Sequence, residues 1–162
     1  MPLINHSRIL KAMGANPWDL SNKVLYDLCS NHQRHLEADV VLAKILLIGR
    51  VYAAAIERRK TKENEEENDN FYIEVVAPTI LNSKIDDWIA EAKATQPGTT
   101  SGFTTLVKVH GLTTALFNQI SGMEKRSLAS KYLHFHVPKL FYIYDSRATQ
   151  ALREFSSVLP RA

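Results

Sequence analysis

The stretch from Gln119 to Phe155 reads QISGMEKRSLASKYLHFHVPKLFYIYDSRATQALREF, and it decides the fold that we expect. Gly122 stands between two segments of helical character, where its permissive backbone predicts a tight hairpin over residues 120–124. A helix is predicted from Lys125 to His134. Pro138 should end it, because proline disfavours helical backbone at the residue before it.

An aspartate opens the last predicted helix of this stretch. Asp145 follows the aromatic run FYIY, and apolar residues recur after it at Ala148, Leu152 and Phe155. This pattern predicts that Asp145 is the N-cap of the helix, with its carboxylate accepting a backbone N–H. A helix cap without any chemistry is the simplest alternative to a catalytic role for Asp145.

Apolar residues at helical spacing continue outside this stretch. They predict helices over residues 20–31, 38–59, 83–94 and 103–118. In the first of these, Leu20 and Val24 are expected on the buried face, with Asp19 or Ser21 as N-cap. Residues 71–77 could form a short helix or a strand, interrupted by Pro78.

Residues 60–70, KTKENEEENDN, contain no apolar side chain and predict an acidic, mobile loop. It divides the chain in sequence, but the two parts are short, and we expect them to share one core. We therefore expect a single all-α domain over residues 1–162.

The composition excludes several classes of protein. The chain has 162 residues, of which 45% are apolar and 23% charged, as in ordinary globular domains. No apolar run is long enough to cross a bilayer, and the N-terminus lacks the pattern of a secretory signal. Cys29 is the only cysteine, which excludes disulfide scaffolds and cysteine-rich zinc sites. A cytoplasmic setting is expected.

The C-terminal quarter of the chain is basic. Residues 120–162 contain seven Lys and Arg against three Asp and Glu, within a net charge of +3 for the whole chain. Such a face attracts phosphates, although an ordinary solvated surface can have the same balance.

No motif indicates a cofactor or a metal. The sequence has no phosphate-binding loop, no dinucleotide-binding turn and no HExxH, so no cofactor is expected. His134 and His136 would lie on one side of an extended segment, as a metal pair could. A third ligand is not evident nearby, so we expect no metal site.

Two short runs, SKYLHFH (residues 130–136) and YDSRA (residues 144–148), complete the pattern begun by the hairpin. Together they resemble the helix-hairpin-helix DNA glycosylases, most closely the bacterial 8-oxoguanine DNA glycosylase-fold proteins. The resemblance covers about residues 104–155 and is only architectural before them.

The resemblance implies an all-α helical array with a helix-hairpin-helix motif at residues 119–134. Such a protein would bind duplex DNA, hold an extruded base and excise a modified base. Asp145 would stabilise the positive charge that develops on the sugar, and a lysine would attack the sugar carbon. The implied catalytic residues are Asp145 and Lys125, and the implied DNA-binding residues are Gly122, Arg126, Lys131 and Arg147.

The chain departs from the family pattern in two places. The family lysine lies nineteen residues before the aspartate, where this chain has Arg126, which remains protonated and forms no Schiff base. Lys125 is one position away, whereas Lys131 lies a turn and a half further along the helix, on a different register. Glu124 stands where the family often has a second glycine.

Two other functions remain open from the sequence. The first is a non-catalytic helix-hairpin-helix module that binds nucleic acid or a nucleotide, including in a bacterial defence setting. The second is an interaction protein whose helices serve only as a scaffold.

Overall fold

The computed structural model describes residues 17–57 and 70–156. This part of the chain is helical and contains no strand, which confirms the all-α prediction. The predicted acidic loop lies, apart from Asn70, outside the described residues. The described helices are α2 (Pro17–Asn31), α3 (Ala38–Val51), α4 (Ala77–Leu81), α5 (Ile85–Ala94), α6 (Thr100–Ser121), α7 (Arg126–His136) and α8 (Ser146–Ser156), with a π-helical segment, η2 (Tyr72–Val76), running directly into α4.

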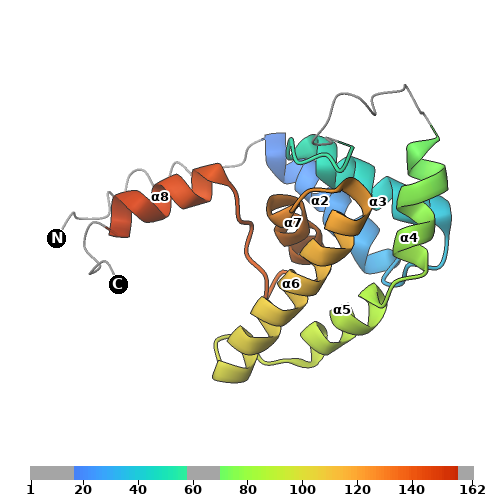
Figure 1. Cartoon of the computed structure of the whole chain (residues 1–162). Helices are drawn as coiled ribbons and strands as arrows, with labels where there is room; N and C mark the ends of the chain where they lie inside the picture. The colour runs from blue at the N-terminus through green and yellow to red at the C-terminus, as the bar shows by residue number, and fades with distance from the viewer. Residues whose placement is uncertain (1–16, 58–69, 157–162) are drawn as a thin grey trace.

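Helix α7 lies at the centre of the molecule. It packs against α2, α3 and α6, while α4 packs on α3 and α5 on α6 (Figure 1). The shared core joins residues from both sides of the predicted loop, among them Leu25, Ile45, Phe117 and Tyr132, as expected for one domain. Helix α8 extends away from this bundle (Figure 1). None of the described helices is long and apolar enough to cross a membrane.

The first two helices differ in extent from the prediction. Helix α2 begins at Pro17, so Asp19 and Ser21 lie inside it and neither stands at its N-cap position. Leu20 and Val24 are 74% and 59% exposed, and the buried positions of α2 are Leu25 and Cys29. The predicted apolar face was therefore partly wrong.

Helix α3 ends at Val51, eight residues earlier than predicted. The chain folds back on the end of the helix, where the Ala54 N–H donates to the Gly49 carbonyl at 2.7 Å. Ala53 adopts a positive φ of 51° in this turn. A Cβ at Gly49 would lie 3.2 Å from Ala55 Cα, so glycine permits the close approach. The turn sets the position of Tyr52, which lines the site described below.

Pro78 does not interrupt the helix that precedes it. Residues 71–81 are continuously helical, and the turns before the proline are π-helical, with the Ala77 N–H donating to the Tyr72 carbonyl five residues back. Pro78 then stands in the first turn of α4, directly after the π-helical turns.

The turn between α6 and α7 lies at Gly122, as predicted, but it is shorter than the predicted hairpin because Ile120 and Ser121 still belong to α6. Helix α6 continues through Gly111 and ends at Ser121, and Gly122 has a left-handed φ of 66°. Helix α7 ends at His136, two residues beyond the predicted end but still ahead of Pro138, as predicted.

A polar network is buried on one side of α7. His35 Nδ1 lies 2.6 Å from Asp86 Oδ1, and His35 Nε2 lies 2.6 Å from the Tyr132 hydroxyl. His136 stacks on both His35 and Tyr132, and its Nδ1 lies 2.8 Å from the Tyr132 carbonyl. Burial lowers the pKa of both histidines, so the Nδ1–H of neutral His35 donates to the Asp86 carboxylate.

Candidate active site

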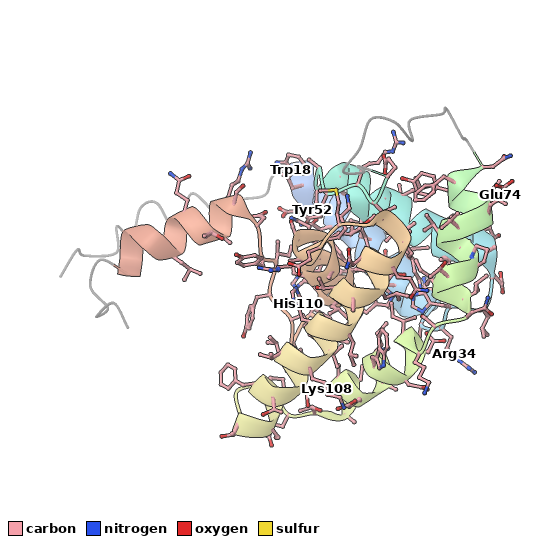
Figure 2. All side chains as sticks on the ribbon, viewed as in Figure 1. Trp18, Arg34, Tyr52, Glu74, Lys108 and His110 are labelled. Carbon is pink, nitrogen blue, oxygen red and sulfur yellow. The ribbon has the colours of Figure 1, made fainter. Side chains whose placement is uncertain are left out.

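A cavity of about 660 Å³ lies where four separate parts of the chain meet: α2, the end of α3 with the turn after it, α7 and the start of α8. The turn after α3 forms one wall, α7 forms another, and the start of α8 closes a third. Trp18 and Tyr52 lie close to one another at this end of the molecule (Figure 2). The lining residues are Trp18, Val51, Tyr52, Ala53, Ser127, Lys131, Asp145, Ser146 and Arg147.

Lys131 is a buried amine in the wall of this cavity. Its side chain is 1% exposed, and its Nζ donates to Ser127 Oγ at 2.7 Å. The same Nζ lies 3.5 Å from Asp145 Oδ2 and 5.7 Å from the centre of the Tyr52 ring. Burial lowers the pKa of Lys131, and the nearby carboxylate of Asp145 partly opposes this effect. The amine is therefore more readily deprotonated than an exposed lysine.

Asp145 uses its two oxygens for different partners. Oδ1 accepts the Ala148 N–H at 2.9 Å, which confirms the predicted N-cap of α8. Oδ2 faces Lys131. The hydrogen bond from Ala148 is the main cause of the lowered pKa of Asp145, and Lys131 lowers it further. The helix cap therefore keeps a carboxylate ionised beside a buried amine.

Tyr52 is held in the cavity wall by α2. Its hydroxyl donates to Asn22 Oδ1 at 2.5 Å, which fixes the ring next to Lys131. The sequence pattern placed Tyr52 in a core helix and gave no reason to single out Trp18. Only the packing of α2 beside the turn after α3 brings the two aromatic rings to this cavity.

The structure separates the predicted site residues into two groups. Lys131, Asp145 and Arg147 line the cavity, whereas Gly122, Lys125 and Arg126 are not among its lining residues. The Lys125 Nζ donates to the Ala55 carbonyl at 3.2 Å. Arg126 forms an exposed ion pair with Glu124. Lys131 is thus the lysine beside Asp145.

The two histidines considered as a metal pair have other partners. They lie in α7 and not in an extended segment. His134 lies 2.8 Å from the Phe141 carbonyl through Nδ1 and 2.6 Å from the Tyr26 hydroxyl through Nε2, while His136 belongs to the network around Tyr132. Within residues 17–57 and 70–156, no cluster of three His, Cys, Asp or Glu is placed to hold a metal ion.

Comparisons with known proteins add no assignment to this geometry. No protein-family model, curated protein or solved structure matches the chain.

Proposed function

We propose that this chain is a DNA glycosylase-like protein that excises a modified base, with Lys131 and Asp145 as its reacting pair. The observation that carries the proposal is the buried Lys131 amine, 3.5 Å from an ionised carboxylate in a cavity of about 660 Å³. Ligand cavities commonly have a volume of this order. The aromatic rings of Trp18 and Tyr52 offer surfaces on which a base can stack.

Each of the two groups has a role in base excision. Departure of the base builds positive charge on the sugar, and the ionised carboxylate of Asp145 stabilises that charge. The Lys131 amine attacks the sugar carbon that bears the base, and the resulting adduct opens to a Schiff base. This attack needs a neutral amine, which the buried position of Lys131 favours. Lys131 therefore replaces Lys125 as our candidate nucleophile.

The DNA would approach from the side of the cavity mouth. We propose that α6, the turn at Gly122 and α7 act as a helix-hairpin-helix motif against one phosphate. Arg147, at the cavity, and Arg126, beside the turn, supply positive charge for neighbouring phosphates. Glu124 forms an ion pair with Arg126 and offsets part of this charge.

Excision assays on duplexes that carry a panel of damaged bases test this function. The variant Asp145→Asn keeps a side-chain acceptor for the Ala148 N–H and should melt close to the parent. It removes the negative charge, so excision should slow by about 10²–10³-fold. Asp87→Asn is the matched control, because Asp87 is an exposed acid in the first turn of α5.

The outcomes separate the alternatives. Equal excision rates for Asp145→Asn and the parent would show that Asp145 is only a helix cap and has no role in excision. A parent that binds duplexes but excises no base from the panel would favour the non-catalytic binding module.

A further inference from the structure

We propose that Ser130 is a positioning residue that holds Asp145 beside Lys131 by clamping the Tyr144 peptide to α7. The effect of this clamp on base excision rests on the proposed function, whereas the existence of the clamp does not.

The Ser130 hydroxyl contacts both polar backbone atoms of Tyr144, a residue fourteen positions away. Its Oγ accepts the Tyr144 N–H at 3.0 Å and lies 3.1 Å from the Tyr144 carbonyl oxygen. The same Oγ lies 2.9 Å from the Ser127 carbonyl, so the single hydroxyl proton is shared between two acceptors. Ser130 is 1% exposed, so little water competes for these contacts.

The segment that carries Asp145 needs such an anchor. It is packed at its beginning, where Leu140 and Phe141 are buried, and His134 holds the Phe141 carbonyl. Toward its end packing weakens, since Tyr142 and Tyr144 have exposed side chains. Helix α8 then leaves the bundle (Figure 1). The Ser130 clamp on Tyr144 therefore holds the residue directly before Asp145.

The clamp and the amine come from adjacent residues of one helix. Ser130 fixes the peptide next to Asp145, and Lys131 places its Nζ 3.5 Å from Asp145 Oδ2. Asp145 Oδ1 accepts the N–H of Ala148 in α8. Because α8 moves together with Asp145, this hydrogen bond cannot fix the distance between Asp145 and α7. The contacts of Ser130 supply that missing constraint. The distance between amine and carboxylate is thus set by Ser130.

The first test uses Ser130→Ala and requires no catalytic activity. Without the clamp, Asp145 moves away from the Lys131 ammonium but keeps the Ala148 N–H, so the pKa of Asp145 should rise by the part that Lys131 contributes. NMR titration of the side-chain carboxyl ¹³C resonance measures the pKa of Asp145. Ser83→Ala is the matched control: Ser83 Oγ also donates to the carbonyl three residues back and accepts one backbone N–H, but it does so between α4 and α5. In Ser83→Ala, the pKa of Asp145 should equal that in the parent protein.

The second test measures single-turnover excision and duplex affinity. Ser130→Ala should excise about 10- to 100-fold more slowly, because a misplaced carboxylate stabilises the sugar cation poorly, while its Kd for duplex stays near the parent value. Ser130→Thr retains the hydroxyl and should restore part of the rate.

The third measurement needs no variant and applies even where Ser130→Ala does not fold. In the parent protein, the Tyr144 amide should exchange its hydrogen at least about 100-fold more slowly than an unprotected amide. Rapid exchange of the Tyr144 amide, or an unchanged pKa of Asp145 in folded Ser130→Ala, would overturn the clamp. A raised pKa in a protein whose parent excises no base would support the clamp and refute the proposed function.

Discussion

Lys125 and Lys131 lie six residues apart but have different surroundings. Lys125 reaches across to the carbonyl of Ala55, while Lys131 is buried beside Asp145. Sequence spacing favoured Lys125, because it lies twenty residues before Asp145, one more than the family spacing of nineteen. The position of a side chain relative to a distant loop depends on how that loop folds back, which spacing does not encode. Asp145 itself could be predicted, since a helix cap is a local property.

The charge of Asp145 should control the titration of Lys131. Burial lowers the pKa of Lys131 and the Asp145 carboxylate raises it, so Asp145→Asn should lower the pKa of Lys131 further. NMR titration of ¹³C-labelled lysine Cε measures this directly, with the Lys125 resonance as the internal control. An unchanged or raised pKa of Lys131 would show that the two groups do not interact.

The buried histidines should make the fold sensitive to acid. His35 and His136 have a pKa below the ordinary value, so the unfolded chain gains protons first as pH falls. Stability from these groups is present above about pH 6.5 and is lost as pH falls toward their folded pKa values, with a slope of at most about 1.4 kcal/mol per pH unit for each. Urea unfolding between pH 7.5 and 5 measures it.

A single substitution tests the origin of this acid sensitivity. His136→Gln should reduce the slope, because it removes one of the two buried histidines whose pKa is lowered. Equal stability of the parent at pH 7 and pH 5 would show that these histidines are not held neutral.

At the scale of elements, local backbone rules predicted some features and missed others. The left-handed Gly122, the end of α7 before Pro138 and the cap at Asp145 each depend on a few neighbouring residues. The end of α3 does not, because Gly49 permits a fold-back that apolar spacing cannot indicate. The helix through Pro78 was missed for a similar reason, since a π-helical turn changes the hydrogen bonds around the proline.

Two glycines of α6 and its hairpin should respond oppositely to substitution. Gly122 has a φ of 66°, so Gly122→Val should destabilise the fold by roughly 1–3 kcal/mol through backbone strain. Gly111 lies within α6, and a Cβ there would meet no atom within 4 Å. Gly111→Ala should therefore stabilise the fold by about 0.5–1 kcal/mol. Thermal and urea unfolding of both variants would measure the contrast. A free energy of unfolding for Gly122→Val equal to that of the parent would contradict the left-handed turn at Gly122.

At the scale of the whole molecule, the candidate site is a product of tertiary packing. Tyr52 comes from the turn after α3, Lys131 from α7 and Asp145 from the start of α8, while Trp18 comes from α2. The all-α class was predictable because helical periodicity is repeated along the chain. The helices that pack against α7 could not be predicted, because the buried polar residues of α7 break the apolar pattern that marks a core helix.

Binding to duplex DNA should depend steeply on salt. Each phosphate that a cation neutralises releases counterions, so the affinity should fall as salt rises. Arg147→Gln should reduce the slope of log K against log salt by about 1. Arg34→Gln is the control, because Arg34 lies far from Trp18 and Tyr52 (Figure 2). Titrations by fluorescence anisotropy would measure both, and an affinity independent of salt would contradict a phosphate-binding surface.

The identity of the lysine that bonds to the sugar tests the central claim most directly. Borohydride reduces a Schiff base to a stable amine, so the parent should be trapped on a damaged duplex, and peptide mass spectrometry should locate the sugar remnant on Lys131. Lys131→Gln should abolish trapping, and Lys125→Gln should leave it intact. A remnant on Lys125, or trapping that survives Lys131→Gln, would contradict the assignment of the reacting pair.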